Sequence, residues 1–305
     1  MRNSQTAFLS GWGVKWRSFL VRSQARILRG MPGRRLYGDL SGCLLGLRLF
    51  LAQRAQWPAV ERFRVLTGSA LSSRAYRRRF FLTKGRDWFW EDMAYEPVSG
   101  ARRFFDVQGA EAVERAVRSG SGAVLIGAHY GPSTAGLLLE QAGMDVRVLA
   151  ADNVVEAWRS QAAQCGRRWV TGKCRFLSDP ARMCVSGSGE RAILRHLRRG
   201  GLMMTHLDLP NRGRGVDSLF FGQPVRFHYF PVKLALRHGA PVFFFDTATR
   251  DARGVYRLVL RPAGSFVSLE EGIARYAAFF EARILRHPFA WKRLPNFFGM
   301  LASQA

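Results

Sequence analysis

Short, largely apolar runs that alternate with helical patterns fill the chain from residue 106 onward. The run AVLIGA at 123–128 carries no charge, and APVFFFDT at 240–247 has its one charged residue near the end. Such runs are typical of strands buried on both faces of a parallel sheet. Further strands are expected at 146–150 and 202–205, an edge strand at 255–260, and helices at 111–118, 133–142, 154–165, 190–199 and 268–286. The alternation predicts an α/β fold with a mainly parallel sheet flanked by helices.

The first 95 residues lack this alternation and favour helices at a membrane surface. Apolar residues at 12, 16, 19, 20 and 27 form a helical stripe with basic residues around it, which predicts a basic amphipathic arm over 1–35. A disordered tail, or one that packs on its own domain, is the alternative. Residues 36–95 are expected to form a helical membrane-docking region in which Leu40, Leu44, Leu47 and Leu51 recur at helical spacing. Asp39 and Arg48 interrupt the best apolar stretch, so no membrane span is expected.

The charge of the chain is strongly basic, and arginine carries most of it. The net charge is +25, and only five of the 47 basic residues are lysines. This predicts an anionic partner: nucleic acid, an acidic carrier protein or anionic lipid. Nucleic acid is the least favoured, because the basic residues are spread over the whole chain and no DNA- or RNA-binding motif occurs.

Polar residues follow two of the expected buried strands, where the reactive groups of open α/β sheets gather. His129 lies in the turn Gly127–Pro132 after the first strand, and Asp208 follows the strand at 202–205. A histidine delivered in this way is well placed as a general base, although it can equally be a hydrogen-bonded core residue. His206 and Asp208 could bind a metal, but a third ligand is not evident, so neither a metal nor a cofactor is expected.

Five blocks of the sequence, in order, resemble the late acyltransferases of lipid A biosynthesis. The chain has His129-Tyr130-Gly131 after the strand where that family has His-Phe-Gly-Asn-Trp-Glu. The other blocks are Val107-Gln108-Gly109, the segment from Gly201 to Asp208, DSLFFGQP at 217–224 with the helix and strand after it, and His287-Pro288 followed by Trp291-Lys292-Arg293. The resemblance covers about residues 36–295. It assigns residues 96–305 to an α/β acyltransferase domain.

The resemblance implies an enzyme that moves a fatty acyl chain from acyl carrier protein, or a related thioester such as acyl-CoA, to a hydroxyl or amine of an anionic lipid or glycolipid. It also implies a peripheral or shallowly anchored protein at the cytoplasmic face of the bacterial inner membrane. In that family the histidine takes the proton of the acceptor, and an acidic residue five positions later orients the imidazole.

This chain has Thr134 at the position of the acidic residue. Threonine can fix the tautomer of His129 but supplies no charge. Three interpretations follow: Asp208 supplies the carboxylate from a neighbouring strand, Glu140 supplies it from the next helix, or the chain is a catalytically impaired relative that binds lipid or acts as a scaffold.

Two further segments are candidates for substrate binding. The loop with Arg212 and Arg214 is typical of an anion site for an acceptor phosphate or a carrier protein. The segment Phe220, Phe221 and Gly222 could line an acyl groove. An ordinary exposed loop and plain core packing are the respective alternatives.

Overall fold

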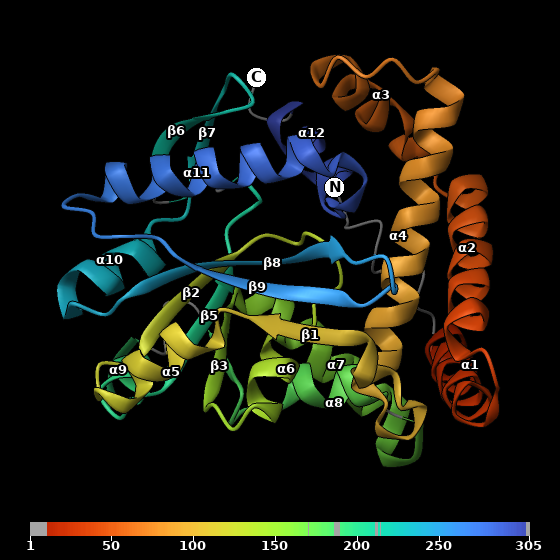
Figure 1. The fold of residues 1–305 in the computed structure, drawn as a ribbon, viewed down its shortest axis with the longest axis horizontal. Coiled ribbons are helices and arrows are strands. Elements are labelled where there is room, and N and C mark those ends of the chain that lie inside the picture. Colours follow the sequence, from red (N-terminus) through yellow and green to blue (C-terminus); the bar gives the residue numbers. More distant parts are fainter. Residues whose placement is uncertain (1–10, 170, 186–189, 211–212, 214, 303–305) are drawn as a thin grey trace.

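A seven-stranded sheet with helices on both faces forms the centre of the molecule (Figure 1). The computed structural model describes residues 11–169, 171–185, 190–210, 213 and 215–302. The strands lie in the order β1-β9-β8-β2-β5-β3-β4, and every neighbouring pair is parallel except β8 and β9. Their bounds are β1 Phe105–Gln108, β2 Ala123–Gly127, β3 Val146–Ala150, β4 Met183–Val185, β5 Leu202–His206, β8 Val242–Arg250 and β9 Tyr256–Pro262. The α/β class and the mainly parallel sheet are confirmed.

One expectation about the sheet is wrong. The segment expected as an edge strand, 255–260, is β9, which lies between β1 and β8. It pairs with β1 through residues that carry no long apolar run, such as Asp106 and Gln108. A four-residue strand with alternating burial is too short to be distinguished by periodicity, so β1 left no signal in the sequence.

The side chains of the sheet alternate between two buried clusters. On one face, Ile126 and Phe244 pack under α9, α10 and α11; on the other, Leu125 and Phe243 pack under α5, α6 and α8. Figure 1 shows α10 and α11 on one side of the sheet and α5 and α6 on the other. These helices are α5 Ala110–Arg118, α6 Ala135–Gln141, α7 Asp152–Trp169, α8 Gly172–Ser178, α9 Glu190–Leu197, α10 Phe230–His238 and α11 Leu269–Arg286.

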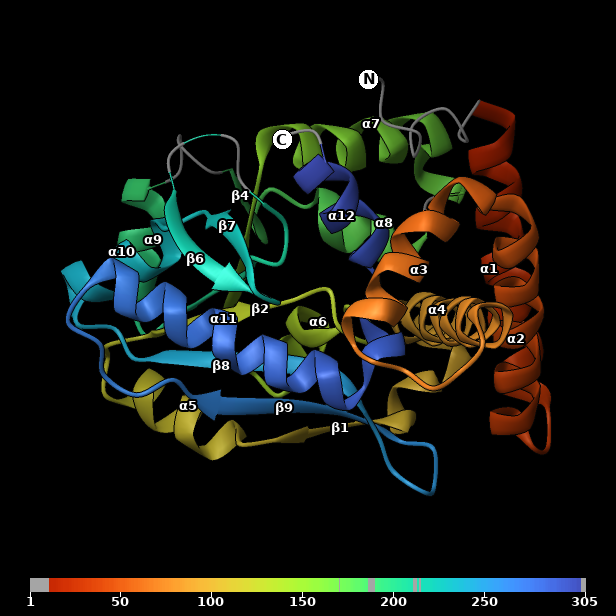
Figure 2. The same ribbon diagram turned by 90° about the horizontal axis from the view of Figure 1, so that it is seen from above.

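A separate hairpin and a C-terminal helix pack above the face covered by α11. Strands β6 (Val216–Phe220) and β7 (Gln223–Phe227) pair antiparallel, and α12 spans Leu294–Ala302. Helix α4 (Ser73–Tyr95) lies between these elements and the N-terminal helices (Figure 2). Since the connection from α11 to α12 passes the end of the sheet, it brings Trp291 and Lys292 to the carboxyl edge of β2.

The first helices form the outer edge of the molecule, as Figure 2 shows for α1 and α2. Their bounds are α1 Gly11–Gly30, α2 Arg34–Ala52 and α3 Trp57–Leu66. No helix among the described residues is long and apolar enough to cross a bilayer. The expected leucine stripe of α2 faces outward, because the helix lays Gly38, Gly42 and Gly46 against α4 instead.

The contact between α2 and α4 depends on glycines, and its loss should be measurable. An ideal Cβ on Gly85 would lie 2.2 Å from the backbone nitrogen of Gly46, a separation that real Cβ atoms do not show. We expect Gly85→Ala to destabilise the protein by about 1–3 kcal/mol, measured by chemical denaturation. Gly30→Ala is the matched control, because no atom lies within 4 Å of its added Cβ. Equal stability of the two variants would contradict this packing.

Candidate active site

Two neighbouring parallel strands bring His129 and Asp208 together. Strand β2 pairs with β5 so that Gly127 lies opposite His206. Each of the two residues follows its register partner by two positions, and the chain turns at this edge of the sheet in both cases. The spatial meeting of the two side chains is therefore a consequence of strand register.

The carboxylate of Asp208 accepts three hydrogen bonds. His129 Nδ1 lies 2.7 Å from Oδ1, the backbone N–H of His129 donates to Oδ2 at 3.0 Å, and the indole N–H of Trp291 donates to Oδ2 at 2.9 Å. Burial alone would raise the pKa of Asp208, which is 1% exposed, but attraction to His129 and these donors hold it well below its ordinary value. Asp208 is therefore an ionised acceptor at neutral pH.

The imidazole of His129 is oriented as a base. With Nδ1–H directed at the carboxylate, the neutral ring carries its lone pair on Nε2. Its side chain keeps 25% of its surface exposed, so a substrate can reach it. Burial lowers the pKa of His129, and Arg293 and Lys292 add to this, while Asp208 opposes it. The balance favours the neutral imidazole, which is the form that accepts a proton.

A second imidazole stacks on the first. The rings of His206 and His129 lie 4.4 Å apart between centroids, with an interplanar angle of 25°, and Phe245 contacts the outer ring edge-on at 5.3 Å. Burial, together with repulsion from His129, lowers the pKa of His206 to about 3. His206 is thus a neutral spacer that limits rotation of the His129 ring.

A buried ion cluster holds the turn that carries His129. The backbone N–H of Lys292 donates to the carbonyl of His129 at 3.0 Å, and that of Ser133 donates to Glu91 Oε2 at 2.8 Å. The carboxylate of Glu91 also contacts the ammonium groups of Lys292 and Lys173. These charges lower the pKa of Glu91 despite its burial, so the cluster links α4, α8 and the C-terminal segment to one turn.

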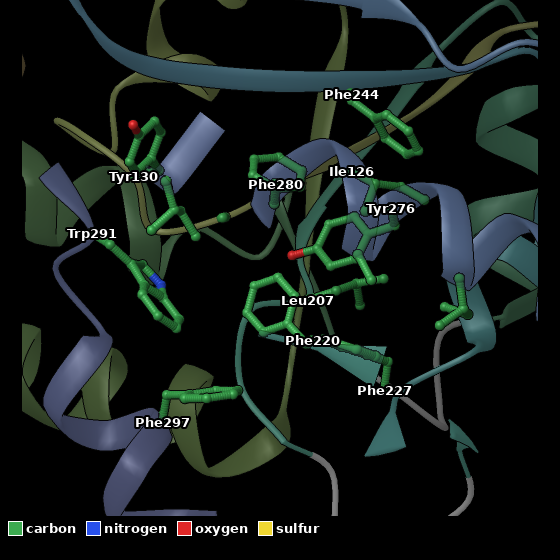
Figure 3. Packing of buried hydrophobic residues seen from close by; sticks show 14 of the residues in the cluster. Ile126, Tyr130, Leu207, Phe220, Phe227, Phe244, Tyr276, Phe280, Trp291 and Phe297 are labelled. Atoms are coloured by element: carbon green, nitrogen blue, oxygen red, sulfur yellow. The ribbon is translucent and has the colours of Figure 1, made fainter. Parts of the chain in front are cut away.

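Trp291 completes the site by packing over the aromatic hairpin (Figure 3). Its ring lies 5.8 Å from that of Phe220 and 5.9 Å from that of Phe221. Both phenylalanines are buried, and Gly222 continues the turn with a φ of +68° after the +53° of Phe221. In this structure the expected acyl-groove residues therefore support Trp291 from beneath.

The other expected site residues lie elsewhere. Glu140 pairs with Arg182 at 2.6 Å, near the end of α6, and has no contact with His129. Thr134 precedes α6 fully buried, and its hydroxyl has no hydrogen-bond partner. Arg212 and Arg214 lie outside the described residues. Of the three interpretations of the missing carboxylate, the geometry matches the one in which Asp208 supplies it.

Sequence reasoning did not anticipate the roles of several neighbours of His129. His206, Glu91 and Lys292 have no local pattern that marks them, although Trp291 and Lys292 belong to a block quoted for the family resemblance. Their lysine and carboxylate types within apolar segments were the one available signal. Among the described residues, no group of three histidine, cysteine, aspartate or glutamate side chains is arranged to hold a metal ion.

A family model for the bacterial lipid A biosynthesis acyltransferases matches residues 58–298, most of the chain. The chain belongs to this family. The matched span contains His129, Asp208 and the whole cluster around them. Membership in the lipid A acyltransferase family makes the protein a transferase of lipid biosynthesis that moves an acyl group to a lipid. A search of curated proteins finds no matching relative.

Proposed function

We propose that the protein transfers a fatty acyl chain from a thioester of acyl carrier protein or coenzyme A to a hydroxyl or amine of an anionic lipid or glycolipid. The observation that carries this proposal is the hydrogen bond between His129 and Asp208. A neutral imidazole with one nitrogen on a buried carboxylate and the other free to accept a proton is the group that such a transfer needs.

In the proposed mechanism, His129 Nε2 takes the proton of the acceptor hydroxyl as its oxygen attacks the thioester carbonyl. The charge that develops on the imidazole is stabilised by Asp208 at 2.7 Å. Collapse of the tetrahedral intermediate breaks the carbon–sulfur bond, and the departing thiolate takes the proton back from His129. The products are the acylated lipid and a free thiol, and the residues return to their first state.

We place this reaction at the cytoplasmic face of the bacterial inner membrane, with residues 1–35 and 36–95 as docking regions. The charge of +25 would attract both an acidic carrier protein and an anionic membrane. Arg212 and Arg214, on the segment between β5 and β6, are proposed to meet the anionic partner.

The test is to incubate purified protein with acyl carrier thioesters or acyl-CoA and a membrane lipid extract, and to search for new products by mass spectrometry. A lipid whose mass rises by one acyl group less one water is the expected result. If no acylated product forms with either donor and a range of chain lengths, the protein is an impaired relative or scaffold instead.

The pH dependence of the reaction should reflect the low pKa of His129. The reaction needs the neutral imidazole, so the rate is full above this pKa and falls as the pH drops through it. Because burial lowers the pKa of His129 from the ordinary 6.5, we expect the acid limb of kcat/KM below pH 6.5. An acid limb centred above that value would show that His129 is not the base, or that it is far more solvated than its environment indicates.

A further inference from the structure

The outer surface of α2 is an apolar ridge. Five leucines point away from the protein along its length, with exposed fractions between 43% and 69%: Leu36, Leu40, Leu44, Leu47 and Leu51. At 1.5 Å per residue the ridge extends over about 22 Å. A continuous row of exposed leucines is costly in water and is typical of a surface that meets another apolar phase.

A basic groove runs beside this ridge, along the seam between α2 and α4. It encloses about 390 Å³ and is lined by Arg78, Arg79, Thr83 and Arg86 from α4 and by Cys43 from α2. Cys43 lies three residues after Leu40 and four before Leu47, so the three share one side of the helix. The groove therefore opens at the foot of the ridge.

The groove has positive charge that the protein does not neutralise. Within the described part of the chain, no carboxylate forms an ion pair with Arg78 or Arg79, both of which are exposed. The Nε of Arg86 is buried there without a hydrogen-bond partner. Three guanidinium groups and the Thr83 hydroxyl offer donors in the geometry that a phosphate oxygen accepts.

We propose that this groove binds the phosphodiester headgroup of an anionic lipid while the leucine ridge lies in the outer acyl layer of the same bilayer. The pairing of an apolar face with arginines at its border is the arrangement of helices that lie in a membrane interface. The choice of a membrane as partner rests on the proposed function. The docking itself is independent of chemistry at His129.

This placement also orients the active site. Arg86 lies five residues before Glu91 on α4, about 7.5 Å along the helix axis, and Glu91 holds the turn of His129 through Ser133. A bilayer seated on the groove therefore lies close to the level of His129. The acceptor lipid would reach the site from the membrane edge instead of crossing open water.

The test measures binding of the full chain to vesicles of phosphatidylcholine with and without phosphatidylglycerol, by flotation. We expect binding that requires phosphatidylglycerol, falls with salt, and drops at least about tenfold in Arg78→Gln/Arg79→Gln. The matched control is Arg198→Gln/Arg237→Gln, which removes the same charge from an exposed basic groove on α9 and α10 and should change binding less than about twofold.

Further arms separate this proposal from its competitors. Leu40→Ser/Leu44→Ser should weaken binding to the anionic vesicles, and His129→Ala should bind as the wild type does, whether or not the protein proves active. Thermal melting checks that each variant is folded, and Arg78→Gln alone serves if the pair is not. Equal losses from the two arginine pairs, no effect of the leucine variant, or full displacement by inorganic phosphate would overturn the proposal.

Discussion

Asp208→Asn is expected to lower kcat for acyl transfer by about ten-thousandfold, because the carboxylate both fixes the tautomer of His129 and stabilises its charged form. An asparagine amide can present its N–H₂ to His129 Nδ1, which reverses the ring and buries the lone pair that should face the substrate. The oxygen that it retains carries no charge to offset the imidazolium. The measurement is single-turnover acyl transfer with saturating thioester.

Two controls give this prediction its meaning. Thr134→Val removes a buried hydroxyl that has no partner, at the position where the family has its acidic residue, and should leave kcat unchanged and stability equal or higher. The double variant His129→Ala/Asp208→Asn should be no slower than His129→Ala alone, because the two residues act as one unit. Activity that survives Asp208→Asn but fails in Thr134→Val would refute the assignment of Asp208.

Glu91→Gln is expected to destabilise the fold by about 3–5 kcal/mol, since it leaves the buried ammonium of Lys292 without its counter-charge. Lys292 is 6% exposed and Glu91 2%, so water cannot replace the lost interaction. Equilibrium denaturation in urea measures the change in the free energy of unfolding.

The control for Glu91 is a pair of the same chemistry at the surface. Glu114→Gln removes the carboxylate that binds Arg118 on α5, where the two side chains are 40% and 71% exposed. Its cost should stay below about 1 kcal/mol. If the two variants lose similar stability, the cluster around Glu91 is more hydrated than its burial indicates.

The sequence predicted those parts of the fold that depend on local pattern. Uncharged runs such as 123–128 became central strands, because burial on both faces requires apolar residues throughout. The carboxyl ends of those strands then followed from topology, which is why His129 and Asp208 could be paired before any coordinates. Strand β1, with Asp106 exposed, gives no such signal.

The remaining features depend on long-range contacts that periodicity does not encode. The spacing of Leu40 and Leu44 predicts a helix but does not state which side faces the protein. The glycines of α2 decided this, since only they allow the backbone of α4 to approach so closely. In the same way, nothing near Glu91 in the sequence indicates Lys292, whose ammonium it meets across 201 positions.

The span of 79 residues between His129 and Asp208 bears on how the protein is made. A ribosome must release the whole of β5 and the residue beyond it before the imidazole has its carboxylate. A nascent or misassembled chain consequently holds a histidine without a counter-ion, and it cannot waste thioesters on water in the cell. Chemical competence arrives together with the completed sheet, so a thioesterase assay on translation intermediates would report when that sheet closes.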